Sequence, residues 1–188
     1  SIGLKPVEAL APKVPGLKLS FLGRLVPGKR ALDVLEAFAL VYKSVPDVRL
    51  SIVGRGTVDY QNLLERKIKD LEILGKVSLV RNATDEQRNE VLKNSHLILV
   101  PSIKEGWGLI VTEANSQGTP AVVYNVDGLR DSVADGVTGL ICRSNRPAEL
   151  ARLVLKLYED RELYDRLRLQ AWEDSQKYDI EKTVNSFE

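Results

Sequence analysis

The feature that most constrains the fold is a regular alternation of short apolar runs with longer amphipathic segments. Each short run has the length and composition of a buried parallel strand, and each longer segment repeats apolar residues at helical spacing. The runs cover residues 19–23, 48–53, 77–80, 97–100, 121–124 and 139–142. We therefore predict an α/β fold: a Rossmann-like, doubly wound parallel sheet of about six strands with helices on both faces.

Helices are expected between these strands. Thr84 with Gln87 three residues later is typical of a capping box that opens a helix. Pro147 suits the first turn of a later helix, whose pattern continues with interruptions to about residue 176. The expected helices cover residues 29–44, about 60–71, 84–94, a segment ending near 117, and 147–158 onward.

The chain divides into one domain with short ends. Its 188 residues fit a single domain, and prolines and glycines forbid a continuous helix over the first sixteen. We assign residues 1–16 to an interdomain linker, 17–178 to the folded domain and 179–188 to a C-terminal helical tail. Because position 1 is not methionine, we expect the chain to be a segment of a longer reading frame.

Composition removes several function classes. Balanced charge, 27 Lys+Arg against 26 Asp+Glu, gives no electrostatic reason to expect nucleic acid as a partner. One cysteine, Cys142, excludes an internal disulfide and suits a reducing, cytoplasmic compartment. One histidine, His96, excludes a His-rich metal site and leaves a Ser-His-Asp triad possible only through itself; a packing role is the better interpretation.

The loop after the first strand, residues 23–30, nearly matches a phosphate-binding P-loop. Arg30 stands where a hydroxyl should bind Mg²⁺, and no later strand ends in the required acid, so we disfavour a nucleotide hydrolase. Arg24 and Lys29 could still meet a phosphate or diphosphate at the end of the strand. The alternative is that both are solvated loop cations.

The loop after the second strand, residues 53–57, contains the pair Gly54 and Gly56. A dinucleotide fingerprint needs a third glycine where Asp59 stands, so tight-turn geometry explains the pair adequately.

The loop after the fourth strand is the most informative. Gly106 and Gly108 let backbone N–H groups approach a ligand, and the following helix N-terminus favours an anion such as phosphate. Glu105 and Glu113 suit neighbouring sugar or ribose hydroxyls, which donate to carboxylates. Three alternatives remain: a surface acid at 105, a first-turn helix acid at 113, or a paired-carboxylate glycosidase, which the glycine loop argues against.

Taken together, these motifs resemble the C-terminal, donor-binding domain of family-four retaining glycosyltransferases with the GT-B fold. The resemblance extends from Leu19 to about Tyr178. The motifs are, in chain order, Gly23-Arg24 with Lys29, Ile52-Val53-Gly54 with Gly56, Pro101-Ser102 with Glu105-Gly106-Trp107-Gly108-Leu109, Glu113-Ala114, Gly118-Thr119-Pro120, Gly128-Leu129-Arg130-Asp131, and Asp135-Gly136 with Thr138-Gly139-Leu140. The chain departs from the family pattern at Arg30, where glycine is common, and at Asn115, where methionine is common.

The resemblance implies a role for each matching residue. Arg24 and Lys29 would bind the donor diphosphate and stabilise the charge that grows on the leaving group, and Glu105 would bind the transferred sugar. Glu113 would hold the ribose, and the segment containing Arg81 would lie near the base. The other implied donor contacts are Gly23, Gly54, Gly106, Trp107, Gly108 and Leu109. Such an enzyme is expected to need no metal or other cofactor.

The resemblance also implies a partner domain. An N-terminal domain that is not in this sequence would carry the acceptor site and any membrane-docking surface. We therefore expect the chain alone to bind a nucleotide-sugar donor weakly and to transfer nothing. The full-length protein would be cytoplasmic or peripheral to a membrane. Two alternatives remain open: a nucleotide-sugar epimerase, and a non-catalytic nucleotide-binding regulatory module.

Overall fold

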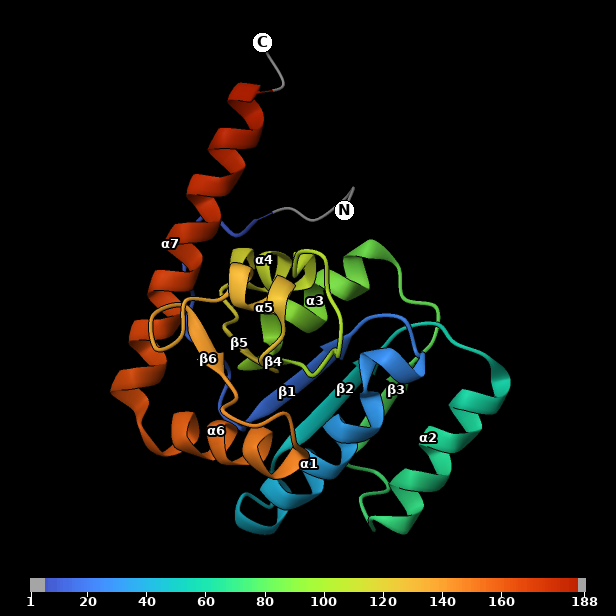
Figure 1. The fold of residues 1–188 in the computed structure, drawn as a ribbon. Helices are drawn as coiled ribbons and strands as arrows, with labels where there is room; N and C mark the ends of the chain where they lie inside the picture. Colours follow the sequence, from blue (N-terminus) through green and yellow to red (C-terminus); the bar gives the residue numbers. More distant parts are fainter. Residues whose placement is uncertain (1–5, 186–188) are drawn as a thin grey trace.

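The computed structural model describes the backbone of residues 6–185 and the side chains of residues 6–178. Within this range six parallel strands form one sheet in the order β3-β2-β1-β4-β5-β6. The α/β, doubly wound prediction is confirmed (Figure 1). The strands are β1 (Lys18–Leu22), β2 (Arg49–Val53), β3 (Val77–Val80), β4 (Leu97–Val100), β5 (Ala121–Val123) and β6 (Gly139–Ile141).

Helices connect these strands. The capping box at Thr84 is present: the Gln87 N–H donates to Thr84 Oγ1 at 3.2 Å, and Gln87 Oε1 accepts from the Thr84 N–H at 2.9 Å. The helices are α1 (Ala31–Ser44), α2 (Val58–Asp70), α3 (Asp85–Asn94), α4 (Leu109–Ser116), α5 (Asp127–Ser132), α6 (Pro147–Glu159) and α7 (Arg161–Asn185), with a short 3₁₀ helix, η1 (Pro27–Lys29).

The helices cover both faces of the sheet, and alternate residues of β4 show this directly. Leu97 and Leu99 belong to the larger core cluster, which also holds apolar residues of α1, α2, α6 and α7. Ile98 and Val100 belong to the second cluster, together with residues of α3, α4 and α5 (Figure 1). A strand buried on both faces reads as a continuous apolar run, which is why the sequence of β4 carries no polar alternation.

The first helix begins later than predicted, at Ala31 rather than Lys29. Pro27–Lys29 forms the 3₁₀ turn η1, and Arg30 adopts a left-handed backbone with φ 59° and ψ 39° between the two helices. A left-handed residue interrupts a right-handed helix, and glycine is the residue that adopts this conformation at least cost. The backbone therefore explains why glycine would be common at the position of Arg30.

The two ends of the chain differ in structure. Residues 6–16 contain no helix or strand, yet they are attached to the domain: the Val7 N–H donates to Ser116 O at 3.0 Å, and Trp172 Nε1 donates to Val7 O at 3.1 Å. The predicted tail is continuous with α7 as far as Asn185, and residues 186–188 lie outside the described residues. The assignment of the first sixteen residues to an interdomain linker stays a prediction.

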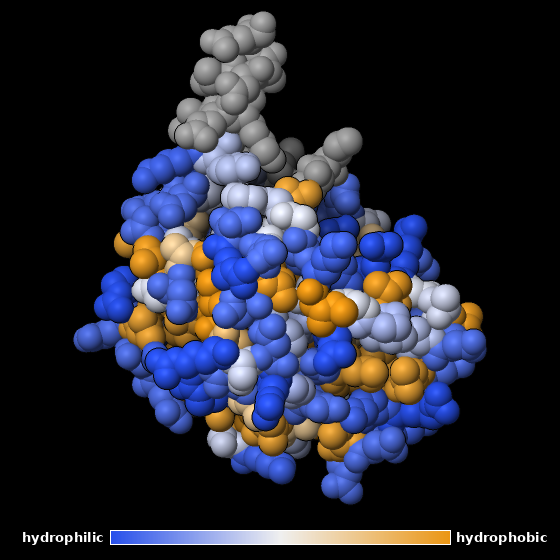
Figure 2. Space-filling model, viewed as in Figure 1, coloured by the Kyte–Doolittle hydropathy of each residue, from blue (hydrophilic) through white to orange (hydrophobic). Residues whose placement is uncertain are grey.

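The surface seen in Figure 2 is mostly hydrophilic, with apolar side chains in separate groups between charged ones. In the described part of the chain, none of the helices combines the length and the apolar character needed to cross a membrane.

The strand order places a ligand site. The direction in which strands are added to the sheet switches between β1 and β4. β2 and β3 lie on one side of β1, whereas β4, β5 and β6 lie on its other side. Doubly wound sheets bind ligands outside the carboxyl ends of their strands at such a switch point. The loops after β1 and β4 are those that carry Arg24 with Lys29 and Glu105 with the two loop glycines.

Candidate functional site

The loops after β1 and β2 are in backbone contact, and Gly54 allows that contact. The Gly23 N–H donates to Val53 O at 3.0 Å, and the Leu25 N–H donates to Arg55 O at 2.7 Å. A Cβ added at Gly54 would lie 1.8 Å from Gly23 O. The glycine is therefore needed for the packing of one loop on the other, in agreement with the tight-geometry alternative to a dinucleotide fingerprint.

A basic cleft of about 460 Å³ lies over the carboxyl ends of β1, β2 and β3. Four arginines and a single acid contribute to its lining. Such a cleft suits a ligand with more than one negative charge, because one guanidinium group can donate two parallel hydrogen bonds to the oxygens of a phosphate. The lining residues are Gly23, Arg24, Val53, Gly54, Arg55, Arg81, Ala83, Asp85 and Arg88.

Glu113 reaches this cleft through an arginine. Its Oε2 lies 3.6 Å from an Nη atom of Arg88, and its side chain is only 12% exposed. α4 carries no acid in its first turn, because Glu113 is the fifth residue of the helix. The first-turn alternative for Glu113 is therefore wrong. Across the cleft, Arg81 forms an exposed ion pair with Glu65 of α2.

Lys29 and Glu105 form a partly buried ion pair between the loops that follow β1 and β4. Their side chains are 23% and 14% exposed. Ser102 Oγ donates to Glu105 Oε1 at 2.8 Å, and the Ile103 N–H donates to Gly28 O at 3.1 Å, which fixes one loop against the other. The interpretations of Lys29 as a solvated cation and of Glu105 as a surface acid are both wrong.

Helix α5, which was not predicted from the sequence, packs against the backbone of the glycine-rich loop, residues 105–108. A Cβ added at Gly128 would lie 2.2 Å from Glu105 O and 2.7 Å from Gly106 O. A Cβ at Gly108 would lie 2.5 Å from Ser132 Oγ of the same helix. At Gly106 no heavy atom lies within 4 Å of the added Cβ, so the open side of the loop begins there. In the sequence, only Gly128 of the motif Gly128-Leu129-Arg130-Asp131 pointed to this close contact.

The four loop residues predicted to contact a donor differ in exposure. Gly106, Trp107 and Leu109 are exposed, whereas Gly108 is buried against α5. The Trp107 ring stacks on Tyr178 of α7, with ring centroids 6.0 Å apart and planes 17° apart. The indole thus packs against α7, and Trp107 is still 39% exposed.

The structure arranges the predicted site residues in two groups along one edge of the sheet. One group is the Lys29–Glu105 pair with Ser102; the other is the basic cleft with Arg24 and, through Arg88, Glu113. Ser102, Arg55 and Arg88 were not predicted as site residues. Ser102 and Arg55 stand in the loops after β4 and β2, which the sequence had already singled out. Arg88 stands in α3, and no sequence motif marked it as a site residue.

His96 lies at the opposite, amino-terminal edge of the sheet, before β4. Its Nδ1 accepts a hydrogen bond from the Lys18 N–H at 3.1 Å, and burial lowers its pKa to about 4. A triad through this residue is excluded at the candidate site. Over the residues whose side chains are described, three or more His, Cys, Asp or Glu side chains nowhere gather as a metal site would require.

The family model for glycosyl transferases group 1 matches residues 7–174. This chain belongs to that family. Its relatives include the poly(glycerol-phosphate) alpha-glucosyltransferase of Bacillus subtilis, 30% identical over 93% of this chain and 26% of the relative. The D-inositol 3-phosphate glycosyltransferase of Nocardia farcinica is 30% identical over 90% of this chain and 37% of the relative. The chain thus spans between a quarter and two fifths of the length of these relatives.

Solved structures agree on the fold. Anabaena HepE in complex with UDP and glucose superposes with a TM-score of 0.79 at 22% identity, over 91% of this chain and 48% of that one. The C-terminal domain of the group 1 glycosyl transferase LpcC from Francisella tularensis superposes with a TM-score of 0.76 at 19% identity, over 85% of each chain. The fold described above is therefore the α/β fold of the domains that these glycosyltransferase structures contain.

Proposed function

We propose that this chain is the donor-binding domain of a retaining glycosyltransferase that transfers a hexose from a nucleoside diphosphate sugar to an acceptor. One observation carries the proposal: the arginine-lined cleft over β1, β2 and β3 and the Lys29–Glu105 pair between the loops after β1 and β4 lie along the same carboxyl edge of the sheet. The complexes of HepE with UDP and with UDP-glucose support a uridine donor.

The leaving diphosphate would be stabilised by cations of the chain itself. Arg24 lines the cleft, and Lys29 follows on the same loop. Groups that are already in place when charge grows on the leaving oxygen lower the barrier without reorganisation. The N-terminus of α4 adds a partial positive charge at the glycine-rich loop. On this account the transfer needs no metal ion and no other cofactor.

The two glutamates would bind hydroxyls. Ser102 Oγ and Lys29 Nζ both contact Glu105 Oε1, so this one carboxylate oxygen is positioned before the sugar arrives. Lys29 would then move from Glu105 toward the diphosphate, which leaves the carboxylate to accept from sugar hydroxyls. Glu113, oriented by Arg88, would accept from the ribose, and Arg81 would lie near the base.

The remaining partner is an N-terminal domain of the same polypeptide. It would supply the acceptor site and any membrane contact, so we expect the full-length protein in the cytoplasm or peripheral to a membrane. Balanced charge gives no reason for a nucleic-acid partner. We expect the present chain to bind donor and to transfer nothing alone.

A thermal-shift panel of nucleoside diphosphates tests this proposal. We expect UDP and UDP-glucose to raise the melting temperature, and UMP, which lacks the second phosphate, to raise it less. A ligand at ten times its Kd stabilises by about 1.4 kcal/mol, or about 3–5 °C for a domain of this size. The shift should survive EDTA. If UDP, GDP and ADP all leave the melting temperature unchanged, the proposal fails.

A further inference from the structure

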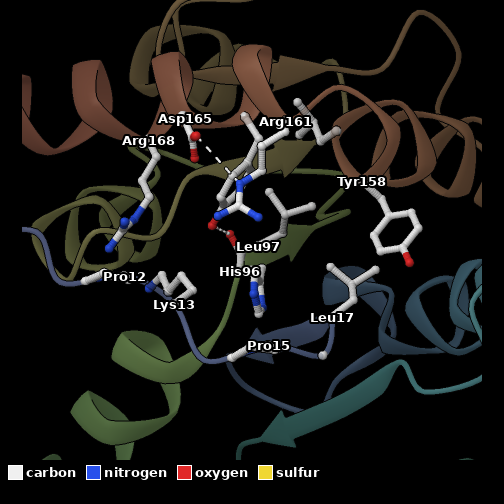
Figure 3. A pocket seen from close by; sticks show the side chains of 13 residues that line it. Pro12, Lys13, Pro15, Leu17, His96, Leu97, Tyr158, Arg161, Asp165 and Arg168 are labelled. Carbon is white, nitrogen blue, oxygen red and sulfur yellow. Dashed lines mark hydrogen bonds and ion pairs between the residues drawn. The ribbon is translucent and has the colours of Figure 1, made fainter.

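A second cavity, of about 300 Å³, lies at the opposite edge of the sheet from the candidate donor site. It is formed by residues 12–17, by the start of β4 and by the junction of α6 with α7 (Figure 3). Its volume is at the lower end of the range found for small-molecule sites. Nothing in the proposed transfer mechanism uses these residues.

Cations dominate the polar part of this cavity. Figure 3 shows Lys13, Arg161 and Arg168 around one hollow, with Asp165 as the acid drawn beside them. Lys13 Nζ donates to Lys93 O at 2.6 Å and to Thr119 Oγ1 at 2.9 Å. Both acceptors are neutral oxygens, so neither hydrogen bond compensates the charge of the lysine.

Arg168 likewise donates hydrogen bonds to neutral backbone oxygens. Its Nε donates to Gly118 O at 2.9 Å, and one of its Nη atoms donates to Ala11 O. Arg161 is 84% exposed at the mouth, and its Nε lies 3.6 Å from Asp165, an exposed ion pair that contributes little and opens readily. Beside one acid, Asp165, the cavity wall thus carries two arginines and a lysine, so its polar part is basic.

The titration of Lys13 agrees with this geometry. Burial, followed by the charges of Arg168 on α7 and Lys93 on α3, lowers the pKa of Lys13 to about 7. The cavity thus disfavours the protonated lysine as long as no anion is present. His96 also faces the cavity, with a pKa of about 4, and stays neutral near pH 7.

The rest of the wall is apolar. Leu17, Leu97 and Leu157 are buried side chains of the wall, and the ring of Tyr158 is half exposed at its edge. An inorganic ion would leave this apolar surface uncovered, whereas a ligand with a hydrocarbon part would bury it and gain binding free energy.

We propose that this cavity binds a small organic anion: a phosphate or carboxylate group held by Lys13, Arg161 and Arg168, on a single-ring or similarly sized apolar body that contacts the leucines. The site is separate from the donor cleft, so the proposal stands or falls independently of the proposed function.

Titration of the 188-residue chain with phenyl phosphate and with benzoate, followed by NMR, tests the site. Arg161→Ala should weaken both ligands about five- to tenfold, because it removes one charge-assisted contact. Asp165→Asn should tighten both, because it removes the facing negative charge. Arg166→Ala, an exposed arginine of the same helix outside the cavity wall, is the matched control and should change neither.

Three further arms sharpen the result. Both ligands should bind equally well with UDP present at saturation, and inorganic phosphate should bind at least several-fold more weakly than phenyl phosphate. Benzoate affinity should fall from pH 6 to pH 8.5 as Lys13 loses its proton, and Lys13→Arg should remove that dependence. Competition by UDP, equal affinity for inorganic phosphate, or unchanged binding in Arg161→Ala and Asp165→Asn would overturn the proposal.

Discussion

Replacing Lys29 with methionine is expected to weaken UDP binding by about ten- to a hundredfold, the size of one lost charge-assisted hydrogen bond. Two effects act in the same direction. The diphosphate loses a cation, and Glu105, which Lys29 neutralises in the free protein, is left facing a ligand of the same sign. Isothermal titration of the parent and the variant with UDP measures the change. In a full-length protein the transfer rate should fall further, since charge grows on the leaving group.

Two variants separate these effects. Lys43→Met removes an exposed cation from the last turn of α1, far from the loop, and should leave UDP affinity within twofold. The double variant Lys29→Met with Glu105→Gln should recover part of the lost affinity, because the repulsive carboxylate is gone. Equal UDP affinity in the parent and Lys29→Met would show that the lysine does not contact the diphosphate.

Gly128→Ala is expected to lower the free energy of unfolding by about 2 kcal/mol and to reduce UDP-glucose affinity at least tenfold. The new methyl group would lie 2.2 Å from Glu105 O and 2.7 Å from Gly106 O, and both are backbone atoms that cannot rotate away. Relief requires the loop to move off α5, which carries Glu105 away from Lys29 and Ser102. Urea unfolding and titration with UDP-glucose measure the two losses.

Gly106→Ala is the matched control for this variant. It adds the same methyl group to the glycine-rich loop itself, at a position where no heavy atom lies within 4 Å of the new Cβ. We expect its unfolding free energy to stay within about 0.5 kcal/mol of the parent. If Gly128→Ala is as stable as Gly106→Ala and binds UDP-glucose normally, α5 does not hold the loop in place.

Two of the strands, β3 and β4, were the most predictable part of the fold. The sequence-predicted bounds of β3 and β4, residues 77–80 and 97–100, agree with the structure. β4 is a continuous apolar run that ends before Pro101, and β3 is a short, mostly apolar run between Lys76 and Arg81. α5 escaped prediction because six residues with one buried leucine, Leu129, give no helical repeat. The late start of α1 depends on the left-handed backbone at Arg30, which no side-chain pattern reveals.

The site was predictable in its residue types but not in its contacts. Arg24, Lys29, Glu105 and Glu113 stand in loops and a helix that end at one edge of the sheet, and strand order alone brings them there. The pairing of Lys29 with Glu105, 76 residues apart, depends on how the loops fold over that edge. Arg88 joins Glu113 through the packing of α3 beside α4, which sequence periodicity does not encode.

In the proposed function, a nucleotide sugar binds over the carboxyl ends of β1 and β4. Backbone NMR of the ¹⁵N-labelled chain, titrated with UDP-glucose, tests it most directly. We expect saturable shifts at the amides of Arg24, Gly106 and Glu113, and none at His96 on the far edge of the sheet. Shifts that gather around His96 and leave the glycine-rich loop unchanged would contradict it.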